Sequence, residues 1–402
     1  MIWSVSDPCQ YPLGSGERRS RSPRRGYRNS IDKRRTLPFY STETELVPGS
    51  ALSDFPCRMA SFSSIVRNGV VGVSNYQSFA DSYTAGLRDI LAEGSEVASV
   101  RDPLSKASGF GQNDRPYREL LAYQSRIADP ASCLAVTPHL PVNLSYCFGL
   151  LAWSLDGRND VDTPAYYRRG AHEYSDDQHT LSGAFGHRLL TSKGNQLEEV
   201  VGRIERDPAH RRAFALVLQP EDNFRQSREY PCAVGVHLFL RDGALTWITV
   251  MRAQQALTVL PYDAFLFMGM QQYAASLLNV PSGPYIHQSG TFHFYENEVG
   301  LARKVVEEPV EAVSLPAFPG TPDGGREVAR ELVDFERRLR LAAQSGDIAA
   351  VDEIAAHKAN TEFADVARAC LATHAYRKLG DTTSLVTSPA SSGGVANLIA
   401  AI

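Results

Sequence analysis

Two side chains whose types and spacing could do chemistry together are Cys232 and Arg252. Cys232 opens an alternating apolar run that turns back at Asp242 and Gly243, and Arg252 ends the returning run. Alternating runs separated by Asp-Gly predict a β-hairpin, so the two residues should face each other across it. The thiolate is the nucleophilic form of cysteine, and a neighbouring cation lowers the pKa of a thiol. The pattern therefore predicts a reactive cysteine beside a guanidinium.

The elements around this hairpin are read from hydrophobic periodicity. Apolar residues at helical spacing predict helices over 76–93, 144–155, 195–206 and 261–278. Alternation predicts further strands over 213–219 and 286–295. The polar and aromatic segment 158–195 is expected to be a long loop region.

The chain has 402 residues, of which 43% are apolar, enough for one large domain with appendages or for two domains. Residues 1–75, rich in Ser, Arg, Pro and Gly, predict a disordered basic arm. Residues 76–315 are the predicted main domain. Residues 326–380 predict an appended segment of three helices, and 381–402 a linker with an apolar tail.

Composition argues against several function classes. The net charge of −4 gives no overall signal for polyanions, and no aromatic residues interleave with the arginines near the start, so nucleic-acid binding is not expected. No apolar run reaches the ~18 residues that span a bilayer. The six cysteines lack CxxC spacing, so neither a disulfide framework nor a metal site is predicted. A cytoplasmic, reducing location is the expectation.

Five motifs, taken in order, resemble those of folate-dependent thymidylate synthases and the related pyrimidine-nucleotide hydroxymethylases. They are DPAHRR at 207–212, PC at 231–232, DGALTWITVMR at 242–252, LPYD at 260–263 and GTFHFY at 290–295. The resemblance extends over roughly 75–305. It implies an α/β (α+β) fold with a large twisted sheet covered by helices, and a homodimer packed sheet against sheet. It also implies a pyrimidine nucleotide substrate and methylenetetrahydrofolate as cofactor.

The resemblance also implies roles for individual residues. Cys232 matches the cysteine that adds to position 6 of the pyrimidine ring and so makes position 5 nucleophilic. Four arginines match the phosphate clamp, two of them reaching in from the partner subunit, and two residues match the pair that hydrogen-bonds the sugar. The clamp is Arg101, Arg252 and the partner-donated Arg211 and Arg212; the sugar pair is His293 and Tyr295.

Asp263 occupies the base-reading position of the family. Members that use uracil nucleotides have asparagine there, and cytosine-using hydroxymethylases have aspartate. A carboxylate accepts from the exocyclic amine of cytosine but donates nothing to the uracil carbonyl unless it is protonated. Asp263 therefore favours a cytosine-type base, although an aspartate after Leu260 and Pro261 could also cap the following helix.

Other positions depart from the family. Its catalytic glutamate should lie near Gly149 or Leu150, yet no Glu or Asp occurs over 135–155. The folate-contacting aspartate and nearby glycine are replaced by Gln255 and Val259. The phosphate-holding serine after the arginine is Ala253. The histidine after the nucleophile is Ala233, although His237, four residues on, is predicted to share its face of the strand.

Three functions remain open at this point. The first is one-carbon transfer to position 5 of a cytidylate-type nucleotide, giving a hydroxymethyl product. The second is a nucleotide-binding sensor or scaffold whose C-terminal helices bind a partner. The third keeps the Cys232 adduct but runs a reaction that does not use folate. Cys232 as a buried core thiol, and His293 as a core histidine, are the non-functional interpretations of two of these residues.

Overall fold

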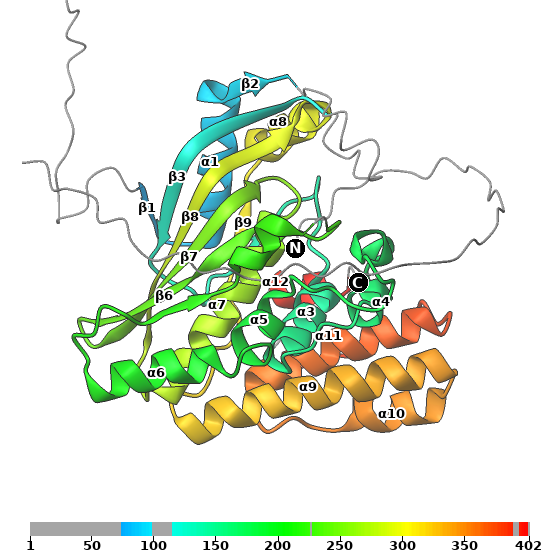
Figure 1. Cartoon of the computed structure of the whole chain (residues 1–402). Helices are drawn as coiled ribbons and strands as arrows, with labels where there is room; N and C mark the ends of the chain where they lie inside the picture. Colours follow the sequence, from blue (N-terminus) through cyan, green and yellow to red (C-terminus); the bar gives the residue numbers. More distant parts are fainter. Residues whose placement is uncertain (1–73, 99–114, 226, 389–393, 401–402) are drawn as a thin grey trace, which may run out of the picture. The chain divides into compact units, whose positions relative to one another are not determined.

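The computed structural model describes residues 74–98, 115–225, 227–388 and 394–400 (Figure 1). Arg101 and nearly all of the predicted arm lie outside these residues. Seven strands form a mixed sheet in the order β1-β3-β8-β7-β6-β5, with β2 pairing to β3. Their bounds are β1 (Ser74–Tyr76), β2 (Ser95–Val97), β3 (Tyr117–Ile127), β5 (Phe214–Leu216), β6 (Ala233–Arg241), β7 (Ala244–Gln255) and β8 (Ser282–Tyr295). A small second sheet pairs β4 (Leu134–Val136) with β9 (Glu311–Val313).

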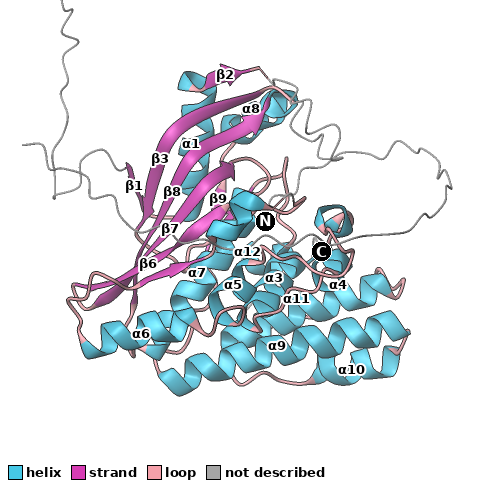
Figure 2. Cartoon of the chain, in the orientation of Figure 1, coloured by secondary structure: helices cyan, strands magenta, loops and turns pink. Residues whose placement is uncertain are grey.

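Helices gather on one face of the large sheet (Figure 2). Along the chain they are α1 (Phe79–Glu93), α3 (Leu144–Leu155), α4 (Asp162–Tyr167), α5 (Phe185–Leu190), α6 (Gln196–Arg206), α7 (Leu260–Leu277), α8 (Val299–Glu307), α9 (Pro322–Ser345), α10 (Ile348–Ala356), α11 (Glu362–Lys378) and α12 (Gly394–Ala400). Short 3₁₀ turns are η2 (Ala171–Tyr174), η3 (Pro220–Phe224) and η4 (Glu296–Glu298). The predicted α/β class is confirmed. Each helix of the described residues is too short or too polar to cross a lipid bilayer.

The predicted hairpin is formed by β6 and β7, joined at Asp242 and Gly243. β7 then runs parallel to β8, and α7 makes the crossover between them. Residues along β7 alternate, with Trp247, Thr249 and Met251 buried toward the helices and the residues between them half-buried on the outer face. This alternation is typical of a strand with one covered face.

A bulge interrupts the β6–β7 pairing next to Cys232. Ala233 pairs with Met251 but Gly235 pairs with Val250, so two residues on β6 pass one on β7. Because the bulge reverses the alternation, His237 lies on the face opposite Ala233. The expectation that His237 shares the face of Ala233 is therefore wrong.

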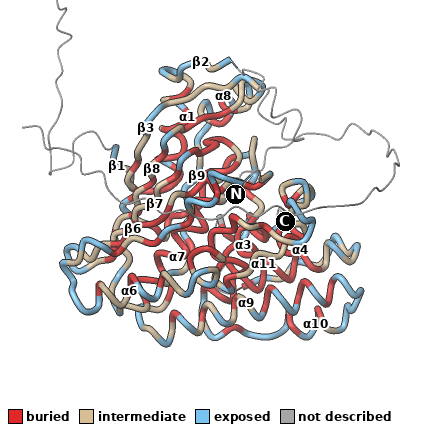
Figure 3. The backbone as a smooth tube through the Cα atoms, in the orientation of Figure 1, coloured by how far each residue is buried: buried red, intermediate tan, exposed pale blue. Residues whose placement is uncertain are grey.

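The C-terminal helices share the core of the rest of the fold. α9 packs against α3, α7 and α11 (Figures 1 and 3). Its Glu336 is fully buried. Glu336 accepts hydrogen bonds from Arg158 at 2.9 Å and Arg340 at 2.7 Å. Three helices form here as the periodicity predicts, but the arrangement is not that of an appendage. The tail adds α12, which packs on α11 and β9.

The segment 158–195 is more ordered than a long loop. It contains α4, η2 and α5, and the aromatic side chains Tyr166, Tyr167 and Phe185 are buried. The helices there are only four to six residues long, too short to show a period in sequence. These short helices position residues around the site described next.

Candidate active site

Cys232 and Arg252 face each other at the start of the hairpin, as predicted. The Arg252 amide donates to the Cys232 carbonyl at 2.8 Å, which sets the two residues opposite one another. The Arg252 guanidinium donates to the carbonyl oxygens of Pro231 and Tyr230 at 2.9 and 3.0 Å, and its Nη2 lies 3.5 Å from the Cys232 Sγ. The guanidinium also stacks over the Tyr230 ring at 4.7 Å. The Arg252 guanidinium is therefore in direct contact with the Cys232 thiol.

β8 passes close to this contact. A side chain at Gly290 would place its Cβ 2.7 Å from the Arg252 carbonyl oxygen, closer than atoms tolerate. The glycine of the GTFHFY motif therefore lets β8 run beside Arg252 and carry His293 and Tyr295 into the same region.

Burial and the Arg252 cation have opposite effects on the pKa of the Cys232 thiol. The thiol is 3% exposed, and this burial raises its pKa, while Arg252 lowers it by a smaller amount. The expectation of a net lowered thiol pKa is therefore wrong for the protein without a ligand. At neutral pH the group is a thiol, and it must lose its proton when a ring arrives.

Asp263 begins a buried chain of hydrogen bonds behind the cysteine. Its Oδ2 accepts from Gln254 at 3.0 Å, Gln254 Oε1 lies 3.1 Å from His287 Nε2, and His287 Nδ1 lies 2.9 Å from the Tyr285 hydroxyl. Burial raises the pKa of Asp263 and lowers that of His287 to about 3, so His287 is neutral. Gln254 is not among the residues predicted from the sequence. Its position two residues after Arg252, in an alternating strand, was the available signal.

His293 and Tyr295 lie together at the end of β8, with ring centroids 5.8 Å apart. Burial lowers the pKa of His293 to about 4, so the ring is neutral. Its Nδ1 is buried and has no hydrogen-bond partner among the described residues. A buried polar atom without a partner is costly, and a ligand hydroxyl would satisfy it.

The other predicted phosphate residues are not brought to Cys232 within this chain. Arg211 and Arg212 are exposed just before β5. Their carbonyl oxygens meet His237 and Arg203, while neither guanidinium has a partner in the part of the chain that the structure describes. Their donation across a dimer interface stays a prediction, as does the role of Arg101.

α3, where the family's catalytic glutamate was expected, carries no acid. It is buried along almost its whole length. A Cβ at Gly149 would lie 2.4 Å from Cε2 of Tyr167, so the Tyr167 ring fills the space of a side chain there. A glutamate at Gly149 would require Tyr167 to move.

Comparisons with known proteins agree with this geometry. The family model of thymidylate synthase matches residues 81–318, more than half of the chain. The chain belongs to the thymidylate synthase family. Thermostable thymidylate synthase A from Bacillus subtilis has a similar fold, with a TM-score of 0.53 and 18% identity over 62% of this chain and 91% of that chain.

Curated relatives include enzymes of phages. The chain is 26% identical over 209 residues to a deoxyuridylate hydroxymethyltransferase of Pseudomonas phage M6, covering 50% of this chain and 56% of that protein. It is 27% identical over 171 residues to a deoxyuridylate hydroxymethyltransferase of Bacillus phage SP01, covering 39% of this chain and 44% of that protein. The chain thus spans about half the length of the curated relatives it matches.

In this thymidylate synthase family member, the Gln255 side chain is hydrogen-bonded by its own chain at both its oxygen and its nitrogen. Its amide donates to Glu298 at 2.8 Å and accepts from the amides of Thr258 and Val259 at 2.6 and 3.0 Å. It is fully buried. The position of the folate-contacting aspartate therefore does not fit that contact.

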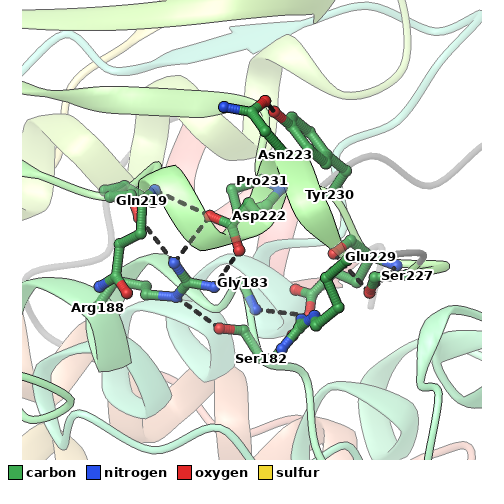
Figure 4. A network of polar contacts seen from close by, with 12 residues as sticks. Ser182, Gly183, Arg188, Gln219, Asp222, Asn223, Ser227, Glu229, Tyr230 and Pro231 are labelled. Carbon is green, nitrogen blue, oxygen red and sulfur yellow. Dashed lines mark hydrogen bonds and ion pairs between the residues drawn. The ribbon is translucent and has the colours of Figure 1, made fainter. Parts of the chain in front are cut away.

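Glu229 is an acid that the sequence reasoning missed. Its carboxylate is 9% exposed and accepts from the Gly183 amide at 2.8 Å (Figure 4). Beside it, Arg188 forms a two-pronged ion pair with Asp222, at 3.0 and 2.9 Å. A glutamate three residues before a candidate nucleophile was the sequence signal available.

Proposed function

We propose that this chain catalyses one-carbon transfer to position 5 of a pyrimidine nucleotide through a covalent adduct with Cys232. The observation that carries the proposal is the Arg252 guanidinium 3.5 Å from the Cys232 Sγ. As the thiol loses its proton, the nearby positive charge stabilises the thiolate that attacks position 6 of the ring. The electron pair displaced from the ring double bond then makes position 5 nucleophilic.

The nucleotide would be oriented by the residues already placed around Cys232. Arg252 supplies a planar donor group suited to phosphate, and Arg101 together with Arg211 and Arg212 of a second subunit would complete the clamp. The exposed positions of Arg211 and Arg212, and the half-buried outer face of β7, support a homodimer joined through the sheet. His293 would take a sugar hydroxyl at its unpaired Nδ1, beside Tyr295.

The base is proposed to be cytosine and the product hydroxymethylated. Asp263 is the acceptor that the exocyclic amine of cytosine requires, and Gln254 fixes one of its oxygens. The phage relatives named as deoxyuridylate hydroxymethyltransferases support the hydroxymethyl product. They also make uracil the competing base, since a protonated Asp263 could donate to a uracil carbonyl.

Methylenetetrahydrofolate is the family's one-carbon donor, but Gln255 and Val259 do not fit its contacts in this chain. Both are buried, and the Gln255 amide is used internally. We therefore derive no step through folate. These two positions favour the two other candidate functions. In one, the Cys232-activated ring reacts without folate; in the other, the nucleotide is bound without reacting.

The proposal is tested with cytidylate, deoxycytidylate, uridylate and deoxyuridylate, each tritiated at position 5, with and without methylenetetrahydrofolate. We expect cytidylate-type nucleotides to release tritium and, with a one-carbon donor, to give a hydroxymethyl product by mass spectrometry. Tritium release that does not need folate favours a reaction of the Cys232-activated ring without folate. Binding without any release supports a sensor, and preference for uridylate contradicts the assignment of Asp263.

A further inference from the structure

One buried acid lies next to the proposed nucleophile and has no role in the mechanism above. Glu229 stands three residues before Cys232, on the segment whose Tyr230 and Pro231 carbonyls Arg252 holds. We propose that Glu229 carries protons to and from position 5 of the Cys232-bound ring, in place of the glutamate that α3 lacks. This inference rests on the proposed function.

Packing holds the Glu229 carboxylate in one place. The Gly183 amide donates to Oε2 at 2.8 Å, and a Cβ at Gly183 would lie 2.7 Å from Pro231 and 3.2 Å from the Glu229 carboxyl carbon. Gly183 thus fits tightly between the acid and the residue before the nucleophile. In the described part of the chain, the Gly183 amide is the only donor to this carboxylate, so one oxygen is left for other contacts.

The surrounding charges leave Glu229 without a cation of its own. Among the described residues, Arg188 of α5 lowers the Glu229 pKa by its charge, but its guanidinium forms both of its ionic hydrogen bonds with Asp222 of η3 (Figure 4). Asp176 adds a second negative charge. Burial is the main reason that the pKa of Glu229 rises to about 7, where a carboxyl can both give and take a proton near neutral pH.

Glu229 is also within electrostatic reach of the nucleophile. Its charge, with that of Asp263, raises the pKa of the Cys232 thiol, although burial is the largest cause and Arg252 opposes it. No acid on α3 competes for this role, because Tyr167 occupies the space beside Gly149. Glu229 is therefore a buried acid on the segment next to Cys232 whose charge reaches the nucleophile.

The proposed step balances without an oxidant or reductant. The Cys232 thiolate forms the bond to position 6, and the ring electron pair takes the proton of the Glu229 carboxyl at position 5. In the reverse direction the hydrogen on the Glu229 face of position 5 returns to the carboxylate, or water removes the hydrogen on the other face; the double bond then returns and the thiolate leaves. In heavy water the net result is deuterium at position 5. After a one-carbon unit is added, the same carboxylate removes the remaining hydrogen.

The test follows exchange of the position 5 hydrogen of cytidylate by proton NMR in heavy water, from acid to alkaline pH. Glu229→Gln should lower the exchange rate by about 10²- to 10⁴-fold while the Kd for cytidylate stays unchanged by calorimetry. Glu229→Asp should recover part of the rate. Glu199→Gln, on the exposed face of α6, is the matched control and should behave as wild type.

The wild-type rate should also show a titration step near pH 7 that Glu229→Gln lacks. Wild-type exchange that Glu229→Gln leaves unchanged overturns the role of Glu229 and leaves the proposed function standing. Absence of exchange in the wild type with every nucleotide overturns both. If Glu229→Gln does not fold, an unshifted titration step in Glu229→Asp overturns the inference.

Discussion

Two regions of the site differ in how their polar groups are used. The nucleotide side, defined by Cys232, Arg252, Asp263 and His293, keeps groups that a ligand can engage. His293 Nδ1 is buried without a partner, and the Arg252 side chain reaches the surface. The cofactor side, defined by Gly149, Gln255 and Val259, is filled and bonded by the chain itself.

Under the proposed function, this difference means that nucleotide binding is kept in this chain while the folate contacts are lost. The Gln255 side chain is fully buried, and its oxygen and one of its N–H groups are already bonded within the chain, so it does not present a free carboxylate-like acceptor to a second ligand. At Gly149, the Tyr167 ring fills the space that a side chain would need. The fold thus keeps the residues proposed for ring activation together, while the positions expected to contact folate are filled by the chain itself.

Removing the nucleophile should break the nucleotide side most severely. We expect Cys232→Ala to lower tritium release from position 5 by about 10⁴-fold or more, because no other group can form the adduct. Nucleotide binding should persist, since Arg252 and Asp263 remain. Cys370→Ala, a buried thiol of α11, is the control and should retain activity. Undiminished release by Cys232→Ala contradicts the covalent mechanism.

Removing the cation should weaken the same side less. Arg252→Met loses charge-assisted contacts to phosphate, so we expect the Kd for nucleotide, measured by calorimetry, to rise about 10- to 100-fold. The Cys232 pKa, followed by thiolate absorbance, should rise further. Arg241→Met, also an arginine of the hairpin stacked on an aromatic ring, is the control. Equal loss of affinity in both variants would argue against a specific phosphate contact.

Restoring the family's acid on the cofactor side should cost stability. Gln255→Asp sets a second carboxylate against Glu298 and loses a donor, so we expect the free energy of unfolding to fall by about 3 kcal/mol. Chemical denaturation measures it. Adding Glu298→Gln should recover part of the loss by restoring a donor. A stable Gln255→Asp protein that gains folate-dependent activity would show that the cofactor side remains open.

Adding volume at α3 should also be destabilising. In Gly149→Ala the new methyl group meets the Tyr167 ring, and overpacking of this kind costs about 1–3 kcal/mol. Tyr167→Ala combined with Gly149→Ala should remove most of that specific conflict, which a double-mutant cycle on thermal unfolding would detect. Simple additivity of the two changes would mean that the ring does not fill this space.

The smallest effect concerns pH and His293. Burial lowers its pKa to about 4 from 6.5, so between these values the unfolded chain binds a proton that the folded chain does not. Stability should therefore fall as pH falls through this window. His293→Asn should show a decrease shallower by about 1 kcal/mol, measured by denaturation at pH 5.5 and pH 7. His139→Asn, half-buried and paired to Glu308, is the comparison.

Sequence reasoning reached the nucleotide side because its signals are local. The hairpin signal at Asp242 and Gly243 places Cys232 opposite Arg252, and the motifs place His293 on the neighbouring strand. The bulge that turns His237 to the other face left no such signal, because it changes pairing by one residue. The sequence shows that Gln255 and Gly149 depart from the family. It does not show which internal contacts these positions make instead.

The features that could not be predicted depend on packing between residues far apart in the sequence. The helices over 326–380 have clear periods, yet their burial against α3 and α7 comes with tertiary contacts such as that of Glu336 with Arg158. Glu229 likewise looks like any polar loop residue until folding brings Gly183 to its carboxylate. Such pairings join residues far apart in sequence, and periodicity carries no information about them.

The central claim is that Cys232 activates a pyrimidine ring independently of the cofactor side. The most direct measurement is hydrogen exchange at position 5 of cytidylate in heavy water with no folate present, comparing wild type with Cys232→Ala. The account predicts exchange by the wild type and its loss in the variant. Absence of exchange by the wild type, or equal exchange by both proteins, would contradict it.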